Sequence, residues 1–241
     1  MEQPQRIRTI FRDLGEKIAD LSREWVGWGG WWGGLLGRGR VGAGAGVAGP
    51  MIASLNVTAY DTAGNVLDTT TSDSDGAFKF SNFTYTGSAL IVMEDANGAA
   101  ADYTDEFTGQ PVDLSVPLRA VIDYTGNITD LSVTPLTELA VRLMGVTNNE
   151  APSATLASQV NAALATAFGL DDVTGPAVAV NGTDYANASA AAQDYGLQLG
   201  SLSAMDGLYG SMEAALANLV GDMTLVTDGS GNVTAVTLGA N

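Results

Sequence analysis

Residues 123–142 read DYTGNITDLSVTPLTELAVR, and this stretch separates two kinds of sequence pattern. Before it, most segments alternate apolar and polar residues, as β-strands do; after it, apolar residues recur at helical spacing. Thr134-Pro135 predicts a helix start, because Thr offers an N-cap oxygen and Pro suits the first helical position. The fold class expected is therefore α+β: an N-terminal antiparallel β-sandwich, a small four-helix domain and a C-terminal β-hairpin.

The β half, residues 47–133, is predicted from short alternating segments separated by turns. Leu55, Val57 and Ala59 alternate with polar neighbours, and residues 89–93 (ALIVM) are apolar on both faces, as in a central strand. Asp61-Thr-Ala-Gly-Asn65 predicts a type I turn with a glycine bulge, and the same pattern recurs at residues 123–127 and 228–232.

The helical half, residues 134–222, is predicted to contain four helices. They are expected at residues 135–144, from the cap Ser153 to Gly169, at residues 183–204, and around Met212 to Val220. Residues 223–241 are expected to form a terminal hairpin, which needs another surface to pack on.

The first 46 residues do not match the rest. Residues 4–26 have helical spacing, and residues 27–46 are rich in Gly and Trp. We expect a disordered or loosely helical leader, excluded from the fold. An interfacial helix, an aromatic anchor and a stretch read out of frame are the alternatives. The leader is too glycine-rich for a transmembrane span and lacks the apolar core of a secretory signal.

Residues 48–80 carry a family resemblance. Ala48-Gly-Pro50, Leu55-x-Val57, Tyr60-Asp61-x-x-Gly64 and Thr71-x-Asp73-x-Asp75-Gly-x-Phe78-x-Phe80 resemble the carboxypeptidase regulatory-like (prealbumin-like) β-sandwich. The resemblance implies a non-catalytic module of a secreted or surface protein.

The helical half is similar to a segment that follows such modules in large bacterial surface proteins and adhesins. The similarity rests on residues 133–140 (VTPLTELA), 161–170 and 195–206. It implies an extracellular, Ig-like cell-adhesion context, and it leads us to expect a fragment of a longer chain.

Composition excludes several classes of function. The chain has no Cys and no His, so disulfides, thiolate nucleophiles, imidazole bases and the usual zinc ligands are absent. Residues 41–241 hold three basic and 22 acidic residues, a net charge of −19. This charge repels phosphate backbones, so we expect no nucleic-acid partner. Glu138 and Asp194 could pair as acid and base, but we expect no enzyme.

Two acidic stretches are candidate sites. Asp73 and Asp75 beside Gly76 suggest calcium, although the Glu expected at the twelfth loop position is replaced by Thr84; turn-capping is the favoured interpretation. A second acidic loop is expected to be a solvated surface. It comprises Asp95, Asp102, Asp105 and Glu106.

The sequence leaves two main hypotheses. The first is a structural or adhesive module of a bacterial surface protein, with neighbouring domains or an extracellular glycan or protein as partner. The second is a carbohydrate- or peptide-binding domain that uses exposed tyrosines. The candidates are Tyr60, Tyr85, Tyr103 and Tyr185. Calcium-dependent rigidity is a third.

Overall fold

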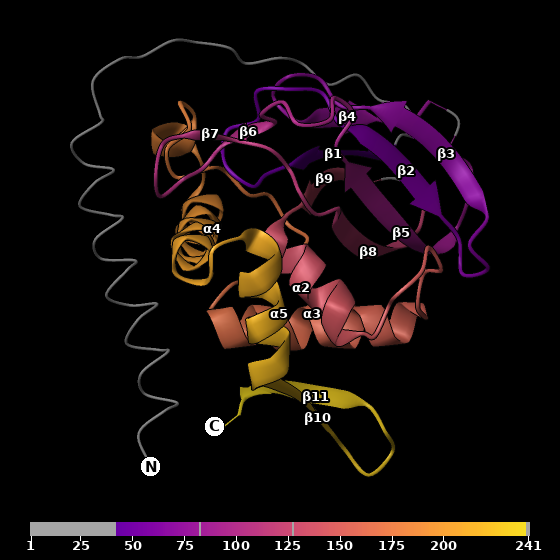
Figure 1. Ribbon diagram of the computed structural model, residues 1–241. Helices are drawn as coiled ribbons and strands as arrows, with labels where there is room; N and C mark the ends of the chain where they lie inside the picture. The colour runs from indigo at the N-terminus through magenta and orange to yellow at the C-terminus, as the bar shows by residue number, and fades with distance from the viewer. Residues whose placement is uncertain (1–41, 82, 127, 240–241) are drawn as a thin grey trace.

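The structure is a computed structural model, and it describes residues 42–81, 83–126 and 128–239. The described chain is a mixed α+β protein with two larger sheets, two separate hairpins and four α-helices. Figure 1 shows the sheets on one side, the helices beneath and beside them, and the terminal hairpin farthest from the sheets.

A four-stranded antiparallel sheet forms the larger part of the β half. Its strand order is β3 (Val66–Thr71), β2 (Asn56–Tyr60), β5 (Gly87–Glu94) and β8 (Leu118–Tyr124). The prediction of a central strand at residues 89–93 is confirmed, because β5 lies between β2 and β8 with these residues buried on both faces.

A three-stranded sheet has the order β4 (Ala77–Lys79), β1 (Gly42–Gly46) and β9 (Ile128–Val133). Strand β1 pairs antiparallel with β4 and parallel with β9. The expectation that residues 1–46 lie outside the fold is therefore wrong for residues 42–46. The rest of the predicted leader, residues 1–41, lies outside the described part of the chain.

Small side chains explain how β1 fits between its neighbours. A Cβ atom on Gly44 would lie 2.5 Å from the Leu131 carbonyl oxygen and 2.9 Å from the Phe78 ring. A Cβ atom on Gly46 would lie 2.9 Å from the sulfur of Met93. The alternating Gly and Ala residues of β1 therefore allow its backbone to lie close to β9, Phe78 and Met93.

The change from strand to helix occurs where the sequence predicts it. Strand β9 ends at Val133, Thr134 is the N-cap, and α2 (Pro135–Leu143) begins with Pro135. The Thr134 hydroxyl accepts the Thr137 N–H while the Thr137 hydroxyl accepts the Thr134 N–H, which forms a reciprocal capping box. This cap is fully buried.

The remaining helices follow the predicted positions, with one correction. Helix α3 (Ala154–Phe168) has Ser153 and Gly169 as its caps, and α5 (Met212–Asp222) starts after Ser211. The third helix is not continuous over residues 183–204. A short 3₁₀ turn, η1 (Tyr185–Asn187), precedes α4 (Ala190–Tyr209), because the Ser189 hydroxyl caps a separate helix start.

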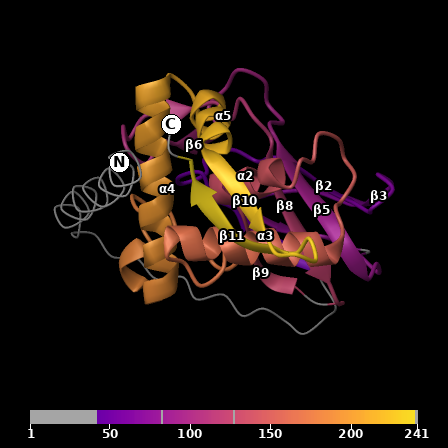
Figure 2. The ribbon, with the colours of Figure 1, turned by 90° about the horizontal axis from the view of Figure 1, so that it is seen from below.

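Two hairpins stand apart from the larger sheets. Strands β6 (Tyr103–Thr104) and β7 (Pro111–Val112) pair with each other, as do β10 (Met223–Thr227) and β11 (Val233–Leu238). The expectation that the terminal hairpin needs another surface is confirmed, because β11 packs on α3. Figure 2 shows the hairpin lying across that helix. The predicted Asp turns form at residues 61–65 and 228–232; Asn127 of the third lies outside the described residues.

One core passes through both halves. Val57 and Met93 of the four-stranded sheet, Leu131 of β9 and Leu136 and Leu164 of the helices belong to the same buried cluster. The opposite face of the four-stranded sheet packs in a second cluster with Val141 of α2 and Ala157 of α3. The helices therefore do not form an independent four-helix bundle, since α2 and α3 also cover the sheet.

In the described part of the chain, none of the helices has both the length and the apolar content that a membrane crossing needs.

Candidate functional site

Asp73 and Asp75, the predicted calcium ligands, lie in a tight turn before β4. One oxygen of Asp73 accepts the N–H groups of Asp75, at 3.0 Å, and of Ala77, at 2.9 Å. The turn places Gly76 at a φ of 81°, which glycine adopts without strain. This geometry favours the turn-capping interpretation of Asp73. Among the described residues, no third carboxylate joins Asp73 and Asp75 in a group that could hold a metal ion.

A different group of carboxylates converges beside β6 and β7. One oxygen each from Asp95, Asp102 and Asp113 lie within 4.8 Å of one another, close enough to share a cation. Asp95 caps the turn after β5 by accepting the Asn97 N–H at 2.6 Å, while Asp113 directly follows β7. Hard cations such as calcium prefer several oxygen ligands in this kind of arrangement.

Asp102 is the buried member of this trio. It is fully buried, and its oxygens accept the Asn97 side-chain amide and the Leu114 N–H, each at 2.9 Å. Burial raises the pKa of Asp102, and the charges of Asp95 and Asp113 raise it further. One oxygen of Asp113 is buried without a hydrogen bond partner. The trio therefore brings three carboxylates together with one buried oxygen that has no hydrogen bond partner in the described chain.

A second acidic cluster lies where the loop between β6 and β7 meets the helical half. It consists of Asp105 and Glu106 on that loop and Asp206 on α4. The expectation of a solvated acidic loop is wrong for three of its four residues, because Asp102 is fully buried, Asp105 is 6% exposed and Glu106 is 8% exposed. We call this contact between residues 105–110 and the helical half the acidic junction.

Hydrogen bonds hold the acidic junction from both sides. Asp105 accepts the Thr108 N–H and hydroxyl, each at 2.6 Å, and also accepts the Ser203 hydroxyl of α4. One oxygen of Glu106 accepts the Val180 N–H at 2.8 Å, while the other is buried with no partner. Burial raises the pKa of Glu106 to about 8. Burial, with the nearby Asp105 charge, raises the pKa of Asp206 to about 7.

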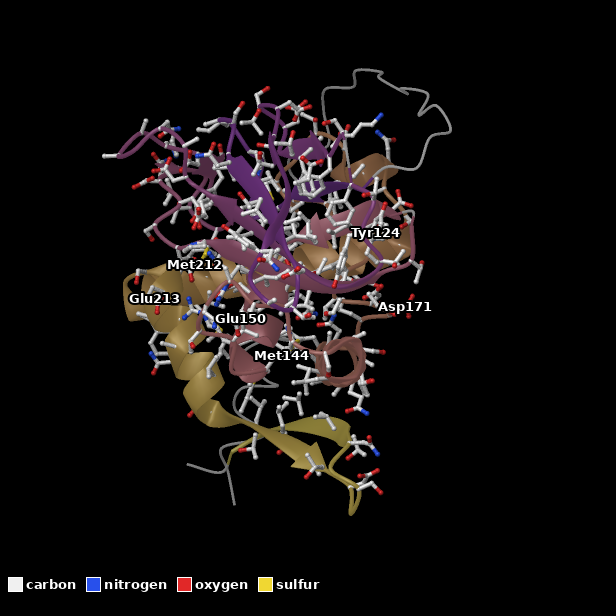
Figure 3. All side chains as sticks on the ribbon, turned by 90° about the vertical axis from the view of Figure 1, so that its right-hand side faces the viewer. Tyr124, Met144, Glu150, Asp171, Met212 and Glu213 are labelled. Atoms are coloured by element: carbon white, nitrogen blue, oxygen red, sulfur yellow. The ribbon has the colours of Figure 1, made fainter. Side chains whose placement is uncertain are left out.

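The other connection between the halves contains the two arginines of the described chain. Glu138 of α2 is 1% exposed, and it accepts hydrogen bonds from Arg119 of β8 and Arg142 of α2. Arg142 also pairs with Glu213 at the start of α5, a position labelled in Figure 3. We call this network the arginine junction. It occupies both oxygens of Glu138, so the predicted acid–base partnership with Asp194, an exposed residue, does not form.

An open groove of about 620 Å³ lies between α3, the edge of the β half and the loop after α3. Acidic residues line it, including Asp123, Asp171 and Asp172, and Figure 3 labels Asp171 on that side of the molecule. The Asp172 carboxylate is already used within its own turn, where it accepts the N–H and the hydroxyl of Thr174, each at 2.8 Å. The groove is wide and has no buried polar group aimed into it among the residues that line it.

The tyrosines proposed for ligand binding do not form one exposed surface. Tyr103 is 3% exposed, so its predicted exposure is wrong. Tyr60, Tyr85 and Tyr185 are half-buried and belong to β2, to the loop before β5 and to η1. A flat aromatic platform for a sugar or a peptide is therefore not assembled from these four residues.

The comparisons with known proteins add no relative: no family model, curated protein or solved structure matches this chain.

Sequence reasoning missed both the acidic junction and the arginine junction. The Glu106–Val180 and Asp105–Ser203 contacts join residues 74 and 98 positions apart, and no local pattern marks such pairs. One signal was present for the arginine junction. Arg119 and Arg142 are rare cations in an acidic chain, and the i,i+4 spacing of Glu138 and Arg142 favours a pair.

Proposed function

We propose that this chain is a non-catalytic structural or adhesive module of a bacterial surface protein, located outside the cell. Its partners would be neighbouring domains of such a protein, or an extracellular glycan or protein. The observation that carries the proposal is the way the two halves are joined. A continuous apolar core and a buried ion network connect the sheets to the helices, as a module that transmits force or holds a fixed orientation requires.

The lack of reactive groups supports a non-catalytic role. The chain has no His and no Cys, and the buried Glu138 is held by two guanidinium groups. Of the other buried carboxylates in the described chain, Asp105 and Glu106 face the helical half, and Asp102 accepts hydrogen bonds from Asn97 and Leu114. General acid–base catalysis needs a group within reach of a bound substrate, and the open groove offers exposed aspartates without a paired base.

We further propose that the β half is a prealbumin-like sandwich. Val57 and Met93 of the four-stranded sheet contribute to the same core as Phe78 and Leu131 of the three-stranded sheet. Each sheet is too small to bury both of its faces alone, so contact between two inner faces is the expected arrangement. This interpretation agrees with the sequence resemblance of residues 48–80.

The location is tested on intact cells of the source bacterium. An epitope tag is inserted between Gly229 and Ser230, in the exposed turn of the β10–β11 hairpin, where an insertion disturbs no buried group. We expect antibody binding to intact cells at the level seen after permeabilisation, while a tagged cytoplasmic protein binds only after permeabilisation. Binding that requires permeabilisation would reject an extracellular module.

Calcium-dependent rigidity is a second candidate function, favoured by one observation. The buried, unpartnered oxygen of Asp113 lies in the trio with Asp95 and Asp102, where a divalent cation would compensate three negative charges. A dissociation constant of about 1 mM is typical of extracellular modules, and at that affinity 10 mM calcium stabilises the fold by about 1.4 kcal/mol.

The calcium hypothesis is tested by thermal unfolding with calcium and with chelator. We expect calcium to raise the melting temperature of the wild type but not of Asp113→Asn. Asp75→Asn is the matched control from the other candidate pair, and it should keep the wild-type response. A response lost in Asp75→Asn and kept in Asp113→Asn would move the site to the turn before β4, and no response in any variant would dismiss calcium.

A further inference from the structure

The acidic junction joins the two halves through one small loop. Besides the bonds of Asp105 and Glu106, the Phe107 N–H donates to the Ser203 hydroxyl at 3.0 Å, and the Asn181 amide donates to the Asp105 carbonyl at 3.2 Å. These contacts connect residues 105–110 to α4 and to the segment before η1. The loop itself belongs to a hairpin with only two residues in each strand, so the helical contacts are a large part of what holds it.

The groups that face Glu106 are acids and phenols. Asp105 lies beside it on the loop, Tyr103 precedes it on β6, and Tyr185 faces it from η1. Asp206 of α4 interacts with Asp105 and Tyr103, Asp102 adds its charge near Tyr103, and Asp194 adds its charge near Tyr185. Arg119 and Arg142 are engaged at the arginine junction, with Glu138 and Glu213. Lys79, the third basic residue of the described chain, is an exposed residue of β4. Among the described residues, no cation acts on the Glu106 carboxyl.

We propose that the acidic junction is a proton-controlled contact: it stays closed while Glu106 carries a proton, and it releases residues 105–110 from the helical half when Glu106 and Asp206 ionise.

The reason is the cost of a buried charge. A neutral Glu106 fills its site with one hydrogen bond, whereas an ionised one leaves a charged oxygen buried, without a donor and beside Asp105. Opening the loop returns that oxygen to water. The raised pKa values of Glu106, about 8, and Asp206, about 7, are consistent with this reasoning.

The direction of the pH effect follows from where the proton is held. The closed junction keeps a proton on Glu106 that the open loop releases above its ordinary pKa of 4.5. Closure is therefore fully favoured below pH 4.5, and it weakens as pH rises toward 8. Each pH unit in that window changes the closing equilibrium by up to about tenfold for one proton.

Hydrogen exchange of the full chain measures this equilibrium at pH 5.5, 7.0 and 8.5, with exchange times scaled to the rate of an unstructured peptide at each pH. The reporters are the amides of Val180 and Phe107, which bond to Glu106 and Ser203 across the junction. We expect their protection to fall at least tenfold from pH 5.5 to 8.5, while the amides of β5 keep theirs.

Three variants separate the proposal from ordinary instability. Glu106→Gln keeps the shape without the charge, so protection at Val180 should stay high at pH 8.5. Glu94→Gln, an exposed glutamate at the end of β5, should behave as the wild type. Ser203→Ala removes the hydroxyl that Asp105 and Phe107 share, so it should lower protection at every pH without changing the pH slope.

Flat protection in the wild type, or a Glu106→Gln profile equal to the wild type, would overturn the proposal. If Glu106→Gln does not fold, as judged by circular dichroism, the wild type decides alone. A fall shared equally by the β5 amides would mean global destabilisation and would also reject a local release.

Discussion

The two junctions between the β half and the helical half each contain a buried glutamate, and they treat it in opposite ways. Glu138 and Glu106 are 1% and 8% exposed. Glu138 receives hydrogen bonds from two arginines, whereas Glu106 receives one backbone N–H and has an oxygen without a partner. Burial alone therefore does not set the cost of a buried negative charge; the groups that face the carboxylate do.

This difference gives the two junctions different roles in the same molecule. The arginine junction connects β8, α2 and α5 through charges that are fully compensated. The acidic junction connects a short loop to α4 through carboxylates that face each other rather than a cation in the described chain. We expect the first to be permanent over the physiological pH range and the second to depend on pH. Four changes test this contrast, beginning with the largest expected effect.

Glu138→Gln should be the most damaging single change. It removes the carboxylate that compensates Arg119 and Arg142, whose side chains are only 16% and 19% exposed. Breaking a buried pair from one side costs about 3 kcal/mol, and the partial exposure of the arginines keeps the loss near that lower value. Urea unfolding at pH 7 measures it. A loss below about 1 kcal/mol would mean that the arginines find other partners and that the junction is not a fixed connection.

Thr134→Ala should cost about 2 kcal/mol. The hydroxyl caps α2 within a fully buried capping box, and it also lies 2.8 Å from the Tyr195 hydroxyl of α4. The cap accounts for about 1 kcal/mol, and the loss of the buried hydrogen bond to Tyr195 accounts for the rest.

Ser153→Ala is the matched control for Thr134, because it removes the N-cap hydroxyl of α3 at an exposed position. Urea unfolding should show about 1 kcal/mol for this variant. Equal losses for the two variants would show that the Tyr195 contact adds nothing and that the connection of α2 to α4 is incidental.

The free energy of unfolding of the whole chain should depend on pH because of the acidic junction. Because the pKa of Glu106 is raised from 4.5 to about 8, its contribution to stability is fully present below pH 4.5 and is lost as pH rises to about 8. Local release of the loop limits the loss, so we expect about 1–2 kcal/mol less stability at pH 8.5 than at pH 5.5. Urea unfolding at both pH values measures it, and Glu106→Gln should remove most of the difference. A stability that rises over this range would contradict the contrast between the junctions.

The sequence predicts the elements of this fold better than it predicts their contacts. Thr134-Pro135, Ser153 and Gly169 mark helix ends correctly because caps depend on residues within one turn. The Asp61 turn is predicted for the same reason. The sequence does not predict strand β1, because Gly44 and Gly46 show no alternation of apolar and polar side chains. These positions must be glycine because Leu131, Phe78 and Met93, far along the chain, leave no room for a Cβ atom.

The candidate sites depend almost entirely on such distant contacts. Asp105 and Glu106 look like any polar loop until Val180, Ser203 and Asp206 are brought against them. The sequence also predicts an exposed Tyr103 beside this loop, whereas the residue is 3% exposed and pairs with Met51, about fifty positions earlier. The sequence does give the charge imbalance directly, since residues 41–241 hold 22 acidic and three basic residues.

Glu213→Gln should have the smallest effect, because Glu213 is the most exposed member of the arginine junction. Glu213 forms a two-point contact with Arg142 at 3.0 and 2.6 Å, but its side chain is 54% exposed. Exposed pairs contribute about 0.2–1 kcal/mol, and salt screens them. We expect a loss in this range in urea unfolding at low ionic strength, and less in 1 M salt. Glu138→Gln should keep most of its loss in the same salt, because burial shields that pair from ions. If both variants lose their effect equally in salt, then the arginine junction is a surface network, and the fixed connection between the two halves is the apolar core.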